Sequence, residues 1–388
     1  NCRTNNGETR IMKRILITST DLMMVQFLLP HVKHLSENGY EVEIACSEVG
    51  GRLDEVREKL EGVVKKVHEV RLRRNPLHPI NYLKGYGDMK KVVAEGNYDI
   101  IWTNEPVMGV VTRLAARETR KKGTKVLYMA HGFHFFTGAP KLNWLVYYPI
   151  EKRMAKHADV IATINMEDFH HAENMPVKRA SYIHGIGVDT SRLKAGLKTC
   201  AIREEIGIND SDLLALSVGE LNSNKNHQIV IRALGKLQRK DIHYAICGRG
   251  ALLEELSALA KDLRIEKNVH FLGYRKDVVA ICSQSDCFIF PSLREGLGLA
   301  PLEAMYTGIP LLTSRRRGPV DFMTEGETGY LFDPTDVDDV ADKIKMITSD
   351  RLKAKGMGTN NKTVVQPFLI ENVKKEVLEL INSLNDGY

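Results

Sequence analysis

Short apolar runs alternate with amphipathic stretches along almost the whole chain, and this rhythm restricts the fold more than any other feature. Runs such as RILITS (14–19), EVEIACS (41–47) and YDIIWTN (98–104) have the length and composition of buried strands. The rhythm continues through KVLYMAH (125–131) and DVIATIN (159–165). Strands that alternate with helices in this way are typical of parallel sheets. The first part of the chain is therefore predicted to be a doubly wound α/β domain.

The same alternation begins again after a polar stretch near residues 190–212. The chain of 388 residues also exceeds the usual size of a single core, which favours two domains. Strands are predicted in this second part at LLALSVG (213–219), HYAICG (243–248), NVHFLG (268–273), CFIFPS (287–292) and IPLLTS (309–314).

The alternation predicts two Rossmann-like domains in tandem, residues 12–190 and residues 191–365. Residues 1–11 are polar and featureless, and MKRILITS resembles a natural start at Met12, so we expect a disordered leader before it. Residues 366–388 are predicted to form a C-terminal helix, and its return to the N-terminal domain is an open alternative.

Composition is that of a soluble globular protein, with 43% hydrophobic and 27% charged residues. No apolar run reaches the roughly 18 residues that span a bilayer, and no signal-peptide pattern is seen, so a cytoplasmic protein is expected. The six cysteines are scattered without a C-x-x-C pair and are expected to be reduced. A net charge of +6 favours anionic partners such as phosphates or lipid head groups and does not require nucleic acid.

The segment PSLREGLGLAPLEAMYTGIP (291–310) joins a predicted strand to a predicted helix and places two glutamates around two glycines. Pro301 suits the first helical position, so Glu303 is expected in the first helical turn and Glu295 at the entrance of the loop. Gly296 and Gly298 let the backbone approach a ligand, and the helix start offers free N–H groups to an anion.

Carboxylates can accept hydrogen bonds from the neighbouring hydroxyls of a ribose or a hexose. An anion site beside two such acceptors predicts a nucleotide-sugar site. The alternative is that Glu303 only favours the helix dipole and that Glu295 is solvated.

Several segments resemble a known family of enzymes. PSLREGLGLAPLEAMYTGIPLLTS resembles the E-x7-E signature of the retaining glycosyltransferases of family 4, and GETGYLFDPTD resembles its usual continuation. HGFHFFTGAPKLNWLVYYPIEKRMAKHADVIATIN and VGELNSNKNHQIVIRAL resemble the branch that builds capsular and exopolysaccharide repeat units on a lipid carrier. The resemblance implies the GT-B architecture, in which two Rossmann-like domains face a cleft and the C-terminal domain holds most of the nucleotide-sugar.

The resemblance also implies roles for single residues of the C-terminal domain. Glu303 would bind the ribose hydroxyls, Glu295 would contact the donor sugar, and Lys225 in NSNKNH would neutralise the pyrophosphate. Backbone amides would reach the sugar hydroxyls and the distal phosphate at Gly296, Leu297, Gly298 and Leu299.

One position departs from the family pattern. Glu220 follows Gly219 where many members carry an arginine, and a carboxylate cannot hold phosphate. Gly219 itself is a candidate for binding the nucleotide-sugar, and we expect another arginine to replace the missing cation beside it. The candidates are Arg249 and Arg317, with Arg294, Arg315 and Arg316 as alternatives.

His131, in MAHGFHF, follows an apolar strand and precedes a glycine, so it is expected to project into the interdomain cleft. The family has a histidine at this place beside the donor sugar, which adds His131 to Glu295 and Lys225 as catalytic candidates. His134 is the weaker candidate of the two histidines. The first loop, STDLMMVQFLLP, lacks the glycine pair often found after the first strand, which leaves the acceptor contacts open.

Metal and redox cofactors are not expected. The acidic DPTDVDD precedes a helix and is predicted to cap it, and no D-x-D group is arranged for a metal-bound pyrophosphate. Lys225, helix-end amides and an arginine would instead offset the charge of the leaving nucleotide. In CGRGALLEEL, Leu253 stands at the third glycine of a dinucleotide fingerprint, which argues against a hydride-transfer enzyme.

The resemblance therefore implies a transferase that moves a sugar from a nucleotide-sugar to a lipid-pyrophosphate-linked saccharide. A UDP-linked donor, such as an N-acetylated hexosamine, is expected. The alternatives are a nucleotide-sugar 2-epimerase of the same architecture and a non-catalytic nucleotide-sugar-binding partner.

Contact with an anionic membrane surface at the inner face of the plasma membrane is a further expectation for the N-terminal domain. Basic segments at residues 71–79 and 113–125 and the mixed aromatic and cationic residues 143–157 favour it. The alternative is that Trp144 and Tyr147 belong to the core and that the cations are ordinary helix-end residues.

Overall fold

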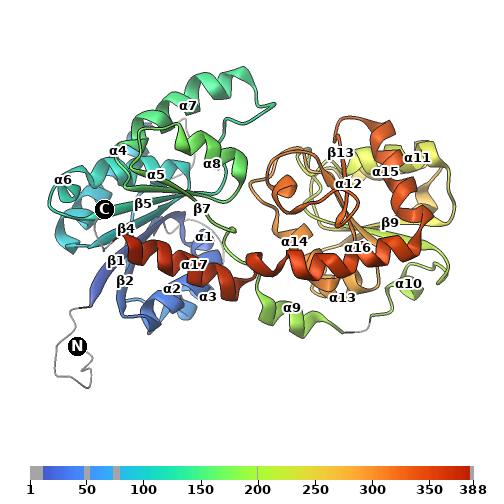
Figure 1. Cartoon of the computed structure of the whole chain (residues 1–388), viewed down its shortest axis with the longest axis horizontal. Coiled ribbons are helices and arrows are strands. Elements are labelled where there is room, and N and C mark those ends of the chain that lie inside the picture. Colours follow the sequence, from blue (N-terminus) through green and yellow to red (C-terminus); the bar gives the residue numbers. More distant parts are fainter. Residues whose placement is uncertain (1–11, 48–52, 73–78, 199, 385–388) are drawn as a thin grey trace. The chain divides into compact units, whose positions relative to one another are not determined.

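The computed structural model describes residues 12–47, 53–72, 79–198 and 200–384 and divides the chain into two compact units (Figure 1). The first unit is Asn1–Gly187 together with Ile370–Tyr388, and the second is Val188–Leu369. The predicted leader, residues 1–11, lies outside the described residues. Within the described residues, no helix has both the length and the apolar character needed to cross a membrane.

The described part of the first unit contains a seven-stranded sheet in the order β3-β2-β1-β4-β5-β6-β7, and every pairing is parallel. Its inner strands are buried on both faces, which explains why their sequences are nearly continuous apolar runs. The strands are β1 (Lys13–Asp21), β2 (Tyr40–Ser47), β3 (Lys66–Glu69), β4 (Ile100–Asn104), β5 (Lys125–Ala130), β6 (Val160–Thr163) and β7 (Arg179–Tyr182).

Helices cover both faces of this sheet, as a doubly wound fold requires. Apolar side chains of α1, α2, α3 and α17 form one core cluster, and those of α4, α5 and α8 form another. The helices are α1 (Leu22–Val25), η1 (Gln26–Leu28), α2 (Leu29–Glu37), α3 (Leu53–Leu60), α4 (Pro79–Gly96), α5 (Pro106–Ala115), α6 (Arg117–Arg120), α7 (Lys141–Ala155), α8 (Met166–Glu173) and α17 (Ile370–Ser383).

The described part of the second unit contains a six-stranded parallel sheet in the order β10-β9-β8-β11-β12-β13. Helices α11, α12, α15 and α16 share one core cluster with it. The strands are β8 (Leu213–Val218), β9 (Ile242–Cys247), β10 (Val269–Gly273), β11 (Cys287–Phe290), β12 (Leu311–Ser314) and β13 (Gly329–Phe332).

The helices of the second unit begin within the polar stretch near residues 190–212, which is therefore part of the folded unit. They are α9 (Thr190–Gly196), α10 (Ile202–Glu205), α11 (His227–Leu237), α12 (Leu253–Asp262), η2 (Glu266–Asn268), α13 (Val278–Ser283), α14 (Leu299–Thr307), η3 (Gly318–Phe322), α15 (Val337–Ser349), α16 (Arg351–Val364) and η4 (Gln366–Phe368).

The predicted fold class is confirmed, since both units are doubly wound parallel sheets. All the apolar runs that were predicted to be strands are strands. The sequence missed β3, β7 and β13, which all lie at sheet edges. Strands β3 and β7 are short, mix charged with apolar residues and contain no fully buried side chain, so they leave no apolar run to recognise.

A buried ion pair joins α5 to α7 in the first unit. The Arg113 guanidinium, which is fully buried, donates from Nη2 to Glu151 Oε2 at 2.8 Å and lies 4.0 Å from the centre of the Tyr128 ring. The Tyr128 hydroxyl donates to the other oxygen of the same carboxylate at 3.3 Å. Removal of the arginine alone would leave a buried carboxylate without its cation.

Arg113→Met is therefore expected to lower the free energy of unfolding of the first unit by about 3–5 kcal/mol. The double variant Arg113→Met/Glu151→Leu should recover most of that loss, because it removes both charges. Urea unfolding followed by tryptophan fluorescence measures the effect selectively, since Trp102 and Trp144 are the only tryptophans and both lie in the first unit. Equal stability of wild type and the single variant would contradict a role for the ion pair.

Candidate active site

The strand order of the second sheet reverses between β8 and β11, and two loops leave the sheet from the carboxyl ends of these strands. Residues 219–226 follow β8 and residues 291–298 follow β11. In open parallel sheets, ligands bind at such a reversal, outside the carboxyl ends of the strands. The predicted donor-binding residues fall mainly on these two loops.

Lys225 and Glu295 form an ion pair between the two loops, with 2.5 Å from Nζ to Oε1. The Lys225 side chain packs against Gly219, where an added Cβ would lie 3.2 Å from its Cδ. Its ammonium lies 5.1 Å from the centre of the Phe290 ring. The fold thus brings together two of the residues predicted to be catalytic. A pyrophosphate that binds Lys225 has to share the ammonium with Glu295.

The asparagines on either side of Lys225 hold the two loops together. Asn224 accepts from Leu293 N–H at 2.8 Å through its backbone oxygen and donates from its side chain to the Arg294 oxygen at 2.9 Å. Asn226 is buried and donates to the backbone oxygen of Pro291 at 3.2 Å. It adopts a left-handed conformation with φ of 55°, which asparagine tolerates better than most residues. The position of Lys225 is therefore fixed by backbone contacts on both sides.

Helix α14 begins two positions earlier than predicted, at Leu299, directly after Gly298 with φ of 92°. Pro301 is thus not the first helical residue, and Glu303 lies beyond the first turn, so this part of the prediction was wrong. The first four N–H groups of a helix have no partner inside it, so proline is tolerated throughout the first turn. The helix ends at Thr307 and is capped by Gly308 in the left-handed conformation.

Glu303 is largely buried and forms an ion pair with Arg192 of α9. Its side chain is 19% exposed, whereas that of Arg192 is 53% exposed. Burial raises the pKa of Glu303 above its usual value, and the attraction of Arg192 only partly opposes this shift. The sequence did not indicate Arg192, because it stands in a polar stretch without a strand or a recognisable motif.

Close backbone contacts explain several glycines around the site. A Cβ at Gly248 would lie 1.8 Å from the Gly219 oxygen, so the loops after β8 and β9 touch through their backbones. A Cβ at Gly318 would lie 2.4 Å from the Gly296 oxygen and 2.4 Å from the Leu297 Cα. The loop after β12 therefore rests on the backbone of the predicted donor-binding loop.

The structure separates the candidate arginines. Arg315 and Arg316 lie 3.8 Å from Asp339 and Asp333 respectively, so both side chains face the acidic segment DPTDVDD at the start of α15. Arg317 is nearly buried, has an unfavourable φ of 51°, and immediately precedes Gly318, which packs on the donor-binding loop.

Two further candidates, Arg249 and Arg294, are exposed on loops at the carboxyl edge. The Arg249 guanidinium lies 6.0 Å from the ring centre of Tyr274, which follows β10. Glu220, which occupies the family arginine position, is exposed and accepts from the Asn222 amide at 2.9 Å. Arg249, Arg294 and Arg317 therefore remain as candidate phosphate-binding cations.

His131 belongs to the first unit, where it follows β5. Its Nε2 lies 3.0 Å from Oδ1 of Asn104, the last residue of the neighbouring strand β4. Burial lowers the pKa of His131, and the nearby Glu105 carboxylate opposes this shift. The histidine is therefore held by a side-chain amide at the carboxyl edge of the first sheet.

Glu105 is another polar residue at the carboxyl edge of the first sheet. It was not among the candidates predicted from the sequence. It adopts φ of 65° at the start of α5, and its carboxylate accepts from Ser19 Oγ and from Thr20 N–H, each at 2.8 Å. The polar residues TNE at the end of an apolar strand were the signal that could have indicated Asn104 and Glu105. The loop after β1 needs no glycine pair, because Asp21 caps α1 by accepting from Met24 N–H at 3.0 Å.

His134 has a packing role beside α7. Its ring centre lies 4.7 Å from that of Tyr147, and its backbone oxygen accepts from the Asn143 amide at 2.9 Å.

The acidic segment DPTDVDD caps a helix, as predicted. Asp336 accepts from the N–H groups of Asp338 and Asp339 at the start of α15, at 2.9 and 3.3 Å. Within the described ranges, no group of three or more His, Cys, Asp or Glu residues is placed to hold a metal ion.

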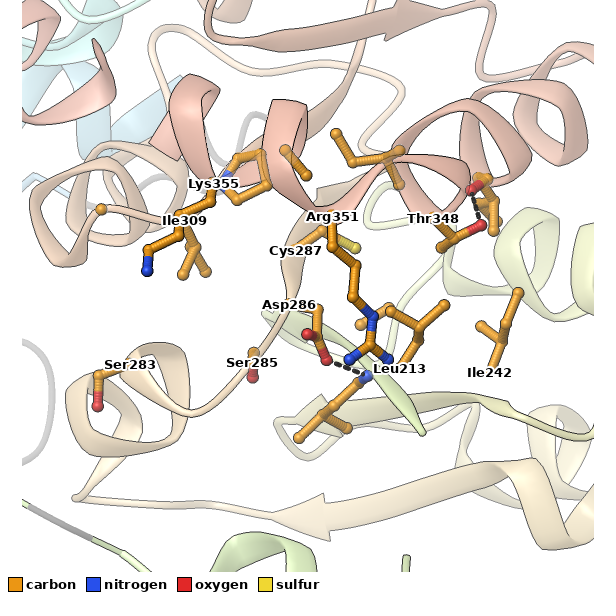
Figure 2. A pocket seen from close by; sticks show the side chains of 17 residues that line it. Leu213, Ile242, Ser283, Ser285, Asp286, Cys287, Ile309, Thr348, Arg351 and Lys355 are labelled. Carbon is orange, nitrogen blue, oxygen red and sulfur yellow. Dashed lines mark hydrogen bonds between the residues drawn. The ribbon is translucent and has the colours of Figure 1, made fainter. Parts of the chain in front are cut away.

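A cavity of about 350 Å³ lies at the opposite edge of the second sheet, beside the amino ends of β8, β9, β11 and β12 (Figure 2). Asp286, Arg351 and Lys355 are among the side chains that line it. Asp286 is already satisfied, since it accepts from Arg203 at 2.7 Å and from Leu214 N–H at 2.8 Å. None of the predicted site residues lines this cavity, so it is not the candidate active site.

The fold and the site at the reversal of the second sheet define a GT-B glycosyltransferase. The solved structure of Anabaena HepE in complex with UDP and glucose superposes with a TM-score of 0.74 at 19% identity, covering 96% of this chain and 100% of that one. The Rickettsia africae glycosyltransferase gives a TM-score of 0.77 at 18% identity, covering 97% and 99%.

Sequence comparisons give the family. The model of the family described as "Glycosyl transferase 4-like" matches residues 16–165, and that described as "Glycosyl transferases group 1" matches residues 199–364. The Bacillus subtilis (strain 168) protein named as the glycosyltransferase EpsD is 34% identical over 381 residues, or 96% of this chain and 97% of that protein.

An Escherichia coli enzyme, UDP-Gal:alpha-D-GlcNAc-diphosphoundecaprenol alpha-1,3-galactosyltransferase, is 26% identical over 355 residues, covering 88% of this chain and 89% of that enzyme. The chain belongs to the family of glycosyltransferases that these two models describe. Its predicted membership of a GT-B glycosyltransferase family is therefore confirmed.

Glu303→Gln is expected to raise the melting temperature of the protein near neutral pH. Because the folded state raises the pKa of Glu303, folding disfavours its charged form, and glutamine removes that cost. The gain should vanish as the pH falls below the pKa of the unfolded glutamate, about 4.3. Calorimetric melting across this range measures the difference, with the exposed Glu327→Gln as control. A lower melting temperature for Glu303→Gln at neutral pH would contradict the inferred cost of burial.

Proposed function

We propose that the protein is a retaining glycosyltransferase that moves a sugar from a UDP-sugar to a lipid-pyrophosphate-linked saccharide. The observation that carries this proposal is the Lys225–Glu295 pair at the reversal of the second sheet, beside the start of α14 and Glu303. The UDP in the HepE complex and the lipid-linked acceptor in the name of the Escherichia coli relative support the two substrates. We place the reaction in capsule or exopolysaccharide synthesis, at the cytoplasmic face of the membrane.

Each residue has a separate task in this proposal. Glycosyl transfer passes through an oxocarbenium-like state as the pyrophosphate leaves, so the protein has to stabilise charge that grows on the leaving group. Lys225 and the amides of Gly298 and Leu299 face that charge. Glu303 binds the ribose hydroxyls, and Glu295 binds the donor sugar while it orients the Lys225 ammonium.

His131 acts on the donor sugar rather than on the nucleotide. Its lowered pKa keeps the imidazole neutral at physiological pH, so it can accept or donate a hydrogen bond without adding charge. We propose that the leaving phosphate takes the proton of the acceptor hydroxyl and that the anomeric configuration is retained. Neither carboxylate is then needed as a general base.

Release of free UDP, with and without acceptor, distinguishes this function from its alternatives. A transferase releases UDP only when the acceptor is present, whereas a 2-epimerase converts the nucleotide-sugar without an acceptor. A non-catalytic binding partner does neither. A screen of nucleotide-sugars with and without a lipid-pyrophosphate saccharide, read out as UDP release, tests the proposal.

We propose that no metal takes part in the transfer. Asp336 of the acidic segment DPTDVDD caps α15. Cationic side chains take the place of a metal ion at the pyrophosphate. Transfer should therefore persist in excess EDTA at near its untreated rate. Complete loss in EDTA that is reversed by magnesium or manganese would overturn this part of the proposal.

Variants of the ion pair should separate binding from transfer. Lys225→Ala should weaken UDP binding by about 1.5–3 kcal/mol and slow transfer as well, because the charge it faces grows in the transition state. Glu295→Gln should bind UDP at least as tightly as wild type, since the ammonium loses its competing carboxylate, yet transfer should be much slower. Calorimetry with UDP and single-turnover transfer measure the two effects.

Two further variants complete this test. His131→Ala should bind UDP normally and transfer slowly, and Glu303→Ala should lose UDP affinity by about 1.5–3 kcal/mol. Lys236→Ala is the matched control for Lys225, because Lys236 is an exposed lysine of the same unit that also pairs with a carboxylate. Wild-type transfer by His131→Ala would make the histidine structural, and unchanged UDP affinity in Glu303→Ala would remove its assigned role.

A further inference from the structure

The side chains of His131 and Asn104 form one hydrogen bond across two neighbouring strands of the first sheet. His131 directly follows β5, Asn104 ends β4, and the bond joins His131 Nε2 to Asn104 Oδ1 at 3.0 Å. A neutral imidazole carries its proton on one nitrogen and a lone pair on the other. The position of that proton therefore decides whether His131 donates a hydrogen bond to a ligand or accepts one from it.

The amide of Asn104 has one orientation that satisfies both of its contacts. Asn104 is 1% exposed, and its side chain also lies 3.3 Å from the backbone oxygen of Thr18 on β1. A backbone oxygen only accepts hydrogen bonds, so the nitrogen end of the amide has to face Thr18 and donate to it. The oxygen end then faces His131. Because this amide oxygen is also only an acceptor, Nε2 of His131 has to carry the proton.

Buried hydroxyl groups surround the contact between Asn104 and Thr18. Thr18 Oγ1 donates to Thr103 Oγ1 at 2.7 Å and lies 3.1 Å from Thr112 Oγ1 of α5. All three threonines are fully buried. Buried polar networks of this kind rigidify a core and favour a single arrangement of their side chains. The orientation of the Asn104 amide is therefore held from below as well as by its own two bonds.

Nδ1 of His131 is the nitrogen that keeps its lone pair. It has no hydrogen-bond partner among the residues that the structure describes, and it is not one of the buried unpaired atoms. His31 of α2 is the contrast, since its Nε2 lies 2.8 Å from the Ile186 oxygen and its unpaired Nδ1 is buried. The lone pair of His131 is therefore accessible to a ligand, whereas that of His31 is not.

We propose that Asn104 is a positioning residue that holds His131 as the Nε2–H tautomer, so that Nδ1 accepts a hydrogen bond from a hydroxyl group of the donor sugar. The inference rests on the proposed function in one respect, because it takes the donor sugar as the ligand of His131. A lone pair attracts a hydroxyl group and repels a carbonyl or carboxylate oxygen. The negative charge of the nearby Glu105 carboxylate strengthens this selection for a hydroxyl group.

Nitrogen NMR of the free protein, labelled with nitrogen-15 histidine, tests the tautomer. His131 should show a protonated Nε2 and a bare Nδ1, and the loss of its signals in His131→Gln identifies them. Asn104→Leu removes the acceptor, so both tautomers of His131 should then be populated, whereas the tautomer of His31 should not change. A bare Nε2 on His131 in the wild type would overturn the proposal.

Asn104→Asp tests the role of the lone pair, because it keeps an oxygen beside Nε2 and adds a negative charge. In the wild type, Glu105 and His31 are the titratable groups that interact with the His131 ring, and burial lowers the pKa of His131. The added carboxylate should raise this pKa and put a proton on Nδ1. Transfer should then fall about tenfold at neutral pH, which is the effect of one lost hydrogen bond, and should recover as the pH is raised.

The wild type should show the same fall only at lower pH, where its own imidazole becomes protonated. Asn174→Asp is the matched control, because Asn174 is an exposed asparagine of the same unit, and it should leave the pH profile of transfer unchanged. A wild-type rate for Asn104→Asp at neutral pH, or a loss that no rise in pH reverses, would overturn the proposal.

The NMR measurement needs neither donor nor acceptor, which keeps this inference distinct from the proposed function. If His131 has a bare Nδ1 and no donor is transferred, the proposed reaction fails and the positioning role of Asn104 stands. If the wild type transfers sugar and His131 carries its proton on Nδ1, this inference fails alone.

Discussion

The ion pair between Lys225 and Glu295 is the contact on which the arrangement of the second unit's site depends. It joins the loop after β8 to the loop after β11, and these loops leave the sheet where its strand order reverses. On flexible loops such a pair would contribute little to stability, because its side chains lose entropy when the pair forms. Here Asn224 and Asn226 fix the backbone on both sides of the lysine, and packing against Gly219 restricts its side chain, so less entropy is lost when the pair forms.

Under the proposed function, the pairing of Lys225 with Glu295 would also affect catalysis. An ammonium that is fully paired stabilises a ground-state anion less than a free one does, and its benefit is greater for a leaving group whose charge increases. The same carboxylate sets the direction of the ammonium. In the proposed mechanism, this one pair would lower unproductive affinity for the nucleotide and orient the cation for the transition state.

The central strands of the fold could be predicted from the sequence because buried strands are recognisable by their apolar composition. Inner strands such as β1 and β11 are apolar on both faces, so their runs were recognised, whereas the half-exposed β3 and β7 have no such run. Glu295 and Lys225 were predicted as site residues because a motif marks each of them, and the fold brings the two side chains together. Arg192 was not, because its contact with Glu303 joins residues 111 positions apart and depends on the tertiary fold alone.

Non-glycine residues with positive φ occur at both edges of the sheets, and Asn97, Gln238 and Arg264 lie where a helix ends before the next strand. Glu105, Asn226 and Arg317 all have positive φ without being glycine, and each lies in a loop that follows the carboxyl end of a strand. Such conformations cost about 1–3 kcal/mol each and persist only where the surrounding contacts enforce them.

The contacts that hold these three residues lie at the carboxyl edge of the sheet in their own unit. Glu105 is held by Ser19 and Thr20, and Asn226 is held by the Pro291 oxygen. Arg317 leads into Gly318, whose backbone touches Gly296. The cavity at the opposite edge of the second sheet has no comparable strained residue among its lining side chains. Its Asp286 is satisfied by contacts within the fold, and Gln238 and Arg264 at the same edge have positive φ only where α11 and α12 end, so the fold itself accounts for that edge.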